Sequence, residues 1–399
     1  MSYSATSSAT RPAAERAGGM APARAQRGVL AAALALAVVI LVLITGAGWR
    51  MPVLFALGIA LGLTLYLTGF GFTSSYRELL VHRNVAAVKA QLVMVALATV
   101  LFAPVLAGGS VFGQPVAGAL APAGVPVAIG AFLFGLGMQL GGGCGSGTLY
   151  TAGGGSPRML VVLAAFCAGG FWASLHMQWW DRLPAAPDVA LSDLLGWPGA
   201  VALQLGVLAV LWLALGRVAR RGARSTQDVP SFLAQRHFWL AGAIALALLN
   251  FSVLLAAGHP WTITWAFTLW GAKSARGLGW DPESAPFWSG DFQRTALEGG
   301  VLQDVTSVMD IGIMIGALAA AGLAARFRPQ FTVPMRSLLA AVVGGLLMGY
   351  GARVAFGCNI GAFFSGVAST SLHGWMWIFA ALAGTWFGIR MRPWFGLKN

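Results

Sequence analysis

Long apolar stretches separated by short polar segments make up most of this chain. Eleven can be marked, at 29–47, 52–70, 85–107, 127–143, 159–180, 198–216, 238–257, 261–272, 302–325, 336–356 and 374–389. Most of them approach the roughly 20 apolar residues that a helix needs to cross a bilayer. The pattern predicts an all-α polytopic membrane protein with about 9–11 membrane helices and some short, broken or re-entrant helices.

The segment 261–272 is too short to span a membrane, and it ends at Lys273. If the basic N-terminus, the basic segment 217–237 and the basic C-terminus all face the cytoplasm, each half must cross the membrane an even number of times. The first half has six apolar segments and the second has five. One segment of the second half must therefore fail to cross. Segment 261–272 is predicted to be a half-helix or re-entrant segment that lines a cavity or is buried by protein.

Composition supports this class, because 58% of the 399 residues are hydrophobic and only 9% are charged. The formal net charge is +13. The arginines fall between the apolar stretches, as the positive-inside rule describes, so the charge indicates topology and contact with the lipid bilayer rather than nucleic-acid binding. We expect a multi-pass membrane protein.

The same pattern divides the chain into four parts. Residues 1–28 are rich in Ser, Ala and Arg and are expected to be a disordered cytoplasmic tail. Residues 29–216 form a first membrane half, 217–237 a basic cytoplasmic linker, and 238–399 a second membrane half.

The two halves contain related segments. The stretch 130–147 (GAFLFGLGMQLGGGCGSG) aligns without gaps with 344–361 (GGLLMGYGARVAFGCNIG) at an offset of 214 residues. Cys144 and Cys358 coincide, together with several glycines. Under the topology above the two copies run in opposite directions, which predicts two inverted halves whose broken helices meet near the membrane midplane.

The residues around the two cysteines suit an anion pathway. Glycine lets a backbone leave helical geometry, and the exposed helix N-termini attract anions. A thiol adds a soft, weak hydrogen-bond donor. The predicted substrate pathway contains Cys144, Cys358, Gly143, Gly145, Gly147, Gly357, Asn359 and Gly361. Cys167 lies in a plain apolar stretch and is interpreted as a packing residue.

Charged residues at membrane depth cost at least about 2.5 kcal/mol each at a helix centre, so each needs a reason. Arg353 and Lys273 are assigned to the substrate pathway, where they would attract an anion. Asp310 is expected to form a structural ion pair with one of them, and a role in proton coupling is the alternative. Three cysteines without a CxxC spacing argue against a disulfide framework and a zinc site, and no cofactor or metal is expected.

The segment 349–377 (GYGARVAFGCNIGAFFSGVASTSLHGWMW) resembles the YeeE/YedE family of bacterial inner-membrane proteins, with WGAK at 270–273 and the Cys144 segment in agreement. The resemblance implies short broken helices around a constricted centre, where cysteines pass thiosulfate along through weak thiol hydrogen bonds. Cys144 and Cys358 match two of those positions. Gly71 stands where many members carry a third cysteine.

The expected function is therefore a membrane transporter or channel, not an enzyme, for a small sulfur-containing ion, thiosulfate first. A selenium-species transporter is the alternative within this class. A membrane persulfide carrier or enzyme that relays sulfane sulfur is the alternative from another class, although cysteine nucleophiles usually need a nearby base. A third possibility is a subunit that recruits a cytoplasmic sulfur-carrier protein through 217–237.

Overall fold

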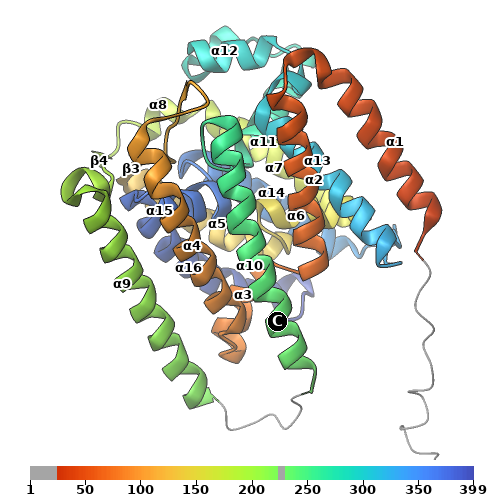
Figure 1. Cartoon of the computed structure of the whole chain (residues 1–399). Helices are drawn as coiled ribbons and strands as arrows, with labels where there is room; N and C mark the ends of the chain where they lie inside the picture. Colours follow the sequence, from red (N-terminus) through yellow and green to blue (C-terminus); the bar gives the residue numbers. More distant parts are fainter. Residues whose placement is uncertain (1–24, 223–229) are drawn as a thin grey trace, which may run out of the picture.

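The computed structural model describes residues 25–222 and 230–399, which are mostly helical (Figure 1). The long helices are α1 (Arg27–Ile44), α2 (Arg50–Thr68), α4 (Ala86–Gly108), α5 (Val125–Gly141), α7 (Pro157–Ser174), α9 (Leu191–Gly222), α10 (Pro230–Ala257), α13 (Val305–Leu323), α14 (Met335–Val354) and α16 (Leu372–Met391). Within these ranges ten helices are long and apolar enough to cross a membrane, which confirms the predicted class.

Shorter elements connect these helices. They include the helices α3 (Phe72–His82), α6 (Gly145–Gly153), α8 (Met177–Trp180), α11 (Thr264–Gly277), α12 (Asp291–Glu298) and α15 (Gly366–Ala368), and the π-helix η6 (Asn359–Ser365). Four strands, β1 (Ser110–Val111), β2 (Gln114–Pro115), β3 (Pro122–Gly124) and β4 (Ala185–Asp188), form two small antiparallel pairs. The strands join connecting segments and contribute little to the architecture.

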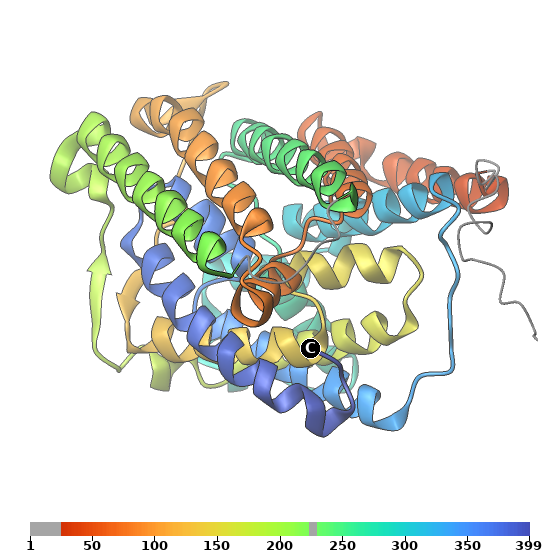
Figure 2. The same ribbon diagram turned by 90° about the horizontal axis from the view of Figure 1, so that it is seen from below.

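The helices form two layers when the molecule is seen from below (Figure 2). One layer contains α9, α4, α10, α2 and α1, and the other contains α5, α7, α14 and α16. Helix α13 packs against α1 and α2 in the first layer and also contacts the short helices α6 and α11. The short helices therefore lie between the two layers, in the interior of the bundle.

Glycines let several helix pairs pack with their backbones close together. A methyl group built onto Gly58 of α2 would lie 2.5 Å from the carbonyl oxygen of Met309 on α13. A methyl group on Gly137 of α5 would lie 2.7 Å from the carbonyl oxygen of Gly344 on α14. Both distances are too short for any residue with a side chain, so this helix packing requires glycine at both positions.

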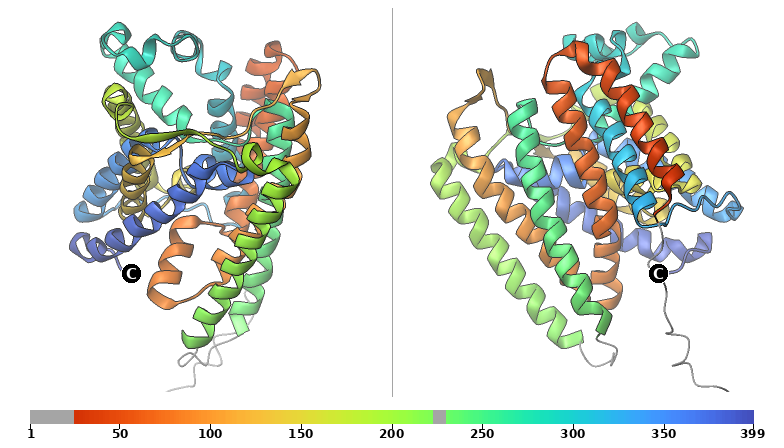
Figure 3. Two further views of the ribbon diagram at one scale, coloured as in Figure 1. Left: turned by 90° about the vertical axis from the view of Figure 1, so that its left-hand side faces the viewer. Right: turned by 45° about the vertical axis from the view of Figure 1, so that its right-hand side comes forward.

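The direction of the chain agrees with the predicted parity. Six of the apolar helices precede residue 223 and four follow it among the described residues, an even number on each side. In Figure 1, α12 lies at the top, whereas the end of α9 and the beginning of α10 lie at the bottom. Figure 3 shows the same separation from two further sides, with α3 near the lower face.

Helices extend into two of the predicted segments. The ends of the expected linker 217–237 are helical, because α9 continues to Gly222 and α10 begins at Pro230. Ala and Arg are good helix formers, so the helix extends past its apolar part. The predicted tail 1–28 lies mostly outside the described residues, and its last residues belong to α1, which begins at Arg27.

Candidate functional site

Both cysteines of the duplicated segment lie where a helix breaks and the next one starts. Helix α5 ends at Gly141, Gly142 takes a left-handed conformation (φ +87°), and Cys144 is the extended residue before α6. Helix α14 ends at Val354, Gly357 has φ +148°, and Cys358 is the extended residue before η6. At φ +148° only glycine is comfortable, so Gly357 is what allows the second break.

Each thiol contacts weakly polar groups at the start of the helix that follows it. The Cys144 Sγ lies 3.4 Å from the Ser146 hydroxyl, and the backbone amides of Gly147 and Phe72 also face it. The Cys358 Sγ accepts a hydrogen bond of 3.5 Å from the backbone N–H of Ile360. These are the long, weak contacts that sulfur makes.

The two breaks meet in space. A methyl group built onto Gly145 would lie 3.3 Å from the Cys358 Sγ and 3.7 Å from Cγ2 of Thr264, the first residue of α11. A methyl group on Gly361 would lie 3.4 Å from the Thr262 hydroxyl, in the segment before α11. Helix α3 also begins at this point, because the backbone amide of its first residue, Phe72, faces Cys144.

Four helices thus begin around the two thiols: α3, α6, α11 and η6. We call this region the central site, and define it by the first residues of these helices, Phe72, Gly145, Thr264 and Asn359, together with Cys144 and Cys358. Helix N-termini carry partial positive charge and unpaired N–H groups. The helix starts at the central site therefore favour an anion without the help of a lysine or arginine side chain.

Two buried hydrogen-bond networks hold the short helices in place. The Gln139 side chain of α5 donates to the Thr73 carbonyl at the start of α3, at 3.0 Å. On the other side, Asn250 of α10 accepts a hydrogen bond of 2.7 Å from the Trp261 backbone N–H and donates one of 3.2 Å to Ser365 of η6. A single amide side chain on a long helix fixes the start of a short helix in each case.

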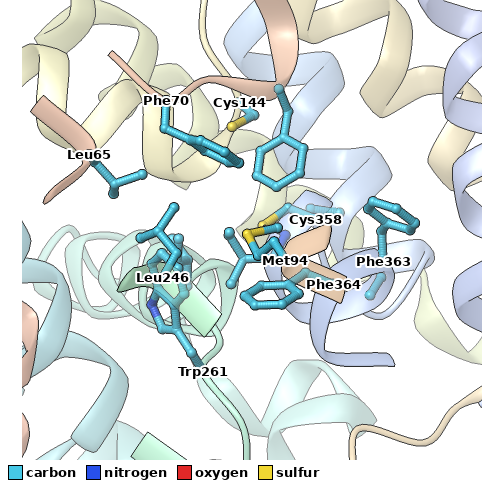
Figure 4. Close-up of a cluster of buried hydrophobic side chains, with 14 of the residues drawn as sticks. Leu65, Phe70, Met94, Cys144, Leu246, Trp261, Cys358, Phe363 and Phe364 are labelled. Carbon is cyan, nitrogen blue, oxygen red and sulfur yellow. The ribbon is translucent and has the colours of Figure 1, made fainter. Parts of the chain in front are cut away.

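The central site is closed in this structure. Cys144 is 1% exposed and Cys358 is fully buried. Figure 4 shows both in one apolar cluster, with Phe70 near Cys144 and with Met94 and Phe364 near Cys358. Passage of an ion requires some of these side chains to move.

Polar groups without hydrogen-bond partners accompany the aromatic side chains. The side-chain amide of Asn359 lies beside the hydroxyl of Tyr76. Among the described residues, neither group has a partner at hydrogen-bonding distance and angle. The Thr148 hydroxyl on α6 is likewise buried and unpaired. Because buried polar groups normally have partners, these three are available to a hydrated or oxygen-rich ligand.

A cavity opens at the far end of α6. It has a volume of about 390 Å³, and Tyr66, Thr151, Ser156, Arg158, Arg328 and Gln330 are among the residues that line it. Arg158 is not free to bind an anion, because its guanidinium donates to the Leu140 and Gly141 carbonyls at the end of α5 and to Ser337. The cavity lies on the side of the molecule to which α6 leads from the central site.

The structure brings together most of the predicted pathway residues. Those at or next to the central site are Cys144, Cys358, Gly143, Gly145, Gly147, Gly357, Asn359 and Gly361. Arg353 and Lys273 instead contact elements of the upper face in Figure 1.

The Arg353 guanidinium lies over the Phe287 ring, 5.0 Å from its centre, and acts electrostatically on Asp181 after α8. Partial burial raises the pKa of the Asp181 carboxyl, and Arg353 opposes that rise. The Lys273 ammonium donates to the carbonyl oxygens of Leu297 at 2.9 Å and Gly299 at 2.5 Å, at the end of α12.

The ion pair expected for Asp310 is not formed among the described residues. Both of its carboxyl oxygens are buried without a hydrogen-bond partner. The physical reason is position: Lys273 lies where α11 meets α12 and satisfies its charge with backbone carbonyls, whereas Asp310 lies in the interior of α13.

Sequence reasoning missed several residues of the site. Tyr76 and Phe72 belong to α3, which was not expected to be a helix, and Thr262 precedes α11. Asn250 and Gln139 were detectable in principle, because each is an amide inside an apolar helix, where an unpaired polar group would be costly.

These features define a class of protein: a polytopic membrane protein whose interior holds four short helices that begin around two thiols. Comparison with known proteins makes the assignment specific. Residues 67–387 match the family described as Sulphur transport, and the chain belongs to this family. The expected resemblance to YeeE/YedE proteins is thereby confirmed, and the protein is a multi-pass protein of the bacterial inner membrane.

Three relatives show how far the similarity extends. The chain is 28% identical over 349 residues to the thiosulfate transporter TsuA of Spirochaeta thermophila, covering 82% of this chain and 95% of that protein. It is 26% identical to TsuA of Escherichia coli, covering 82% and 91%. It is 34% identical over 155 residues to the probable transporter YedE of Escherichia coli, and this match spans only 38% of either chain. The family and these relatives are named for transport and not for an enzymatic reaction.

Proposed function

We propose that this protein transports thiosulfate across the membrane through the central site. The observation that carries the proposal is the meeting of two thiols with the starts of four helices at one buried point. The relatives named as thiosulfate transporters, which the chain matches over most of their length, support the choice of ion.

The chemistry of the central site suits an ion that must leave again. Among the described residues, the contacts of the two thiols are with a hydroxyl, backbone amides and apolar side chains, and not with a lysine or arginine. Helix N-termini supply a diffuse positive field, and the thiols supply weak donors suited to a soft sulfur atom. Thiosulfate would be held loosely and handed from Cys144 to Cys358 or in reverse.

We further propose that residues 29–216 and 238–399 are inverted halves. Gly130 and Gly344 are equivalent in the sequence alignment, as are Gly137 and Gly351. Methyl groups built onto Gly130 and Gly137 would each lie 2.7 Å from a carbonyl oxygen, that of Gly351 and Gly344 respectively. Each copy's first glycine thus meets the other copy's second, which is the pattern of contacts that a two-fold axis produces.

The helix contacts extend this relation over both halves. Helix α5 packs on α16, and its counterpart α14 packs on α7, the counterpart of α16. Likewise α2 packs on α13, and its counterpart α10 packs on α4, the counterpart of α13. The short helices α3 and α11 correspond in the same way, since each follows a long helix and starts at the central site. Such inverted repeats suit transport by alternate opening toward the two sides of the membrane.

Two other expectations have less support. A persulfide enzyme would need a base to activate a thiol, and within the described residues neither thiol is hydrogen-bonded to a histidine. Recruitment of a cytoplasmic sulfur carrier through 217–237 involves a segment that lies partly outside the described residues, and it stays a proposal. A selenium-bearing ion is the remaining rival for the same site.

The experiment that tests the function is uptake of ³⁵S-labelled thiosulfate by vesicles that contain the purified protein. We expect saturable uptake that unlabelled thiosulfate suppresses, with weaker competition from sulfate, whose outer atoms are all hard oxygens. Selenite and sulfite test the rival ions. Uptake no faster than in protein-free vesicles would refute transport, and stronger competition by selenite than by thiosulfate would reassign the substrate.

A further inference from the structure

Asp310 is a carboxyl group in the membrane interior to which the proposed pathway gives no task. It lies on α13, its exposed fraction is 0%, and both oxygens lack a hydrogen-bond partner. A charged carboxylate without partners is unfavourable at membrane depth, and such residues face the bundle interior and mark ion or proton pathways. Asp310 in this setting is expected to hold a proton.

The face of α13 that carries Asp310 lies against the short helices α6 and α11. One turn before it, the Ser307 hydroxyl accepts a hydrogen bond of 2.9 Å from the Trp270 indole of α11. One turn after it, the Met314 carbonyl lies against Gly153 of α6. Residues three and four apart share a helix face, so Asp310 lies between its contacts with α11 and α6. Both of those helices begin at the thiols.

Few charged groups can act on this carboxyl. Cys358 of the central site, Cys167 of α7 and Asp304 at the start of α13 are within electrostatic range of Asp310. The other titratable side chains on the helices packed against α13 are Arg27, Arg50, Tyr66, Tyr150, Lys273 and Arg276. Of these, Lys273 and Arg276 both donate hydrogen bonds to the Leu297 carbonyl.

We propose that Asp310 binds a proton that enters the cell together with each thiosulfate ion. This inference rests on the proposed function and adds its driving force. The proton binds from the outer side, stays on the carboxyl while the anion passes the thiols, and leaves to the cytoplasm. A dianion of charge −2 then moves with one proton as a net charge of −1. A metal cation is a poorer fit, because the described residues contain no cluster of three or more His, Cys, Asp or Glu side chains that could hold one.

The physical need for a proton comes from the membrane potential. An inside-negative potential of 100 mV lowers the accumulation of an anion about 50-fold for each negative charge. A proton that moves with each anion cancels one negative charge, and this removes one of these roughly 50-fold losses of accumulation. It also couples uptake to the pH gradient, so that one unit of inward gradient raises the accumulation ratio about tenfold.

The test measures thiosulfate and protons in the same vesicles. An imposed gradient, acidic outside by one pH unit, is expected to raise thiosulfate accumulation by wild-type protein about tenfold. A pH dye inside the vesicles is expected to report acidification when thiosulfate is added outside. Asp310→Asn, which keeps the shape of a protonated carboxyl, is expected to retain exchange of labelled for unlabelled thiosulfate but to lose both effects.

The matched control is Asp188→Asn, on an exposed position of β4, which is expected to behave like the wild type. If Asp310→Asn accumulates thiosulfate in response to the gradient as the wild type does, the inference is overturned. It is overturned also if wild-type uptake proceeds without proton entry, a result that does not depend on the variant folding. Absence of any thiosulfate flux in wild-type vesicles would instead refute the proposed function itself.

Discussion

A single methyl group can probe how tightly the two halves meet at the thiols. The side chain of Gly145→Ala would lie 3.3 Å from the Cys358 Sγ and 3.5 Å from the Cγ2 atom of Ile263. These neighbours are side-chain atoms that can shift by tenths of an ångström, so we expect little change in thermal stability. The passage beside Cys358 becomes narrower, and we expect the initial rate of thiosulfate uptake to fall several-fold.

The control for this change is Gly206→Ala on α9, where nothing lies within 4 Å of the added methyl group. That variant is expected to transport at the wild-type rate. An uptake rate for Gly145→Ala equal to that of Gly206→Ala would show that the ion does not pass between α6 and Cys358.

Residue chemistry also shows where sequence reasoning reaches its limit. Cys144 and Cys358 were identified because they coincide in a duplicated segment, and that signal needs no knowledge of the fold. The partners of Lys273 and Asp310 were not predictable, because a charge in an apolar stretch says that a partner is needed but not which one. The Lys273 ammonium is hydrogen-bonded to backbone carbonyls, whereas the Asp310 carboxyl has no hydrogen-bond partner among the described residues.

Among the elements, the break before η6 depends on one backbone conformation. Gly357 has φ +148°, and a methyl group there would lie 2.8 Å from the Ala362 backbone nitrogen. A residue forced into such a conformation costs about 1–3 kcal/mol, and the close contact adds to this. We therefore expect Gly357→Ala to lower the thermal unfolding midpoint by several degrees, as followed by tryptophan fluorescence in detergent, and to reduce uptake.

Gly361→Ala is the matched comparison from the same break. Its added methyl group would lie 3.4 Å from the Thr262 hydroxyl, an ordinary contact, and its φ is not in the left-handed region. The thermal midpoint of this variant is expected to stay near that of the wild type. If both variants unfolded at the same temperature, the conformation of Gly357 would not be what maintains the break.

The short helices were the least predictable elements. Segment 261–272 was recognised as a half-helix because it is too short to cross, and α11 confirms a short helix that starts at Thr264. Helix α3 was missed because FTSSYRELLVH is polar enough to resemble a loop between two apolar stretches. Helix α6 was hidden by the glycines of GGGCGSG, which predict a break but not the helix that follows.

For the whole molecule, composition and apolar periodicity were enough for the class and for most of the crossing helices. The even number of apolar helices in each half of the described residues agrees with the parity predicted from the arginines and from the short length of 261–272. The sequence did not predict that four helices begin at one point. That arrangement depends on how two layers of helices pack through glycine contacts.

The proposed inverted arrangement of the two halves would give the molecule its mode of action. Two related halves, each with a broken helix and a thiol, can open to opposite sides while the central site stays between them. In the closed state seen here, the aromatic cluster around Phe70 and Phe364 separates the thiols from water (Figure 4). Opening on the lower side would connect Cys144 with the cavity at the end of α6.

The most direct test of the account is the thiosulfate uptake rate of three cysteine variants in reconstituted vesicles, with folding checked by size-exclusion chromatography. We expect Cys358→Ala to abolish uptake and Cys144→Ala to slow it at least tenfold. Cys167→Ala, at the packing cysteine of α7, is expected to leave the rate unchanged. If folded Cys144→Ala and Cys358→Ala proteins both transport at the rate of Cys167→Ala, thiosulfate does not travel by way of these thiols.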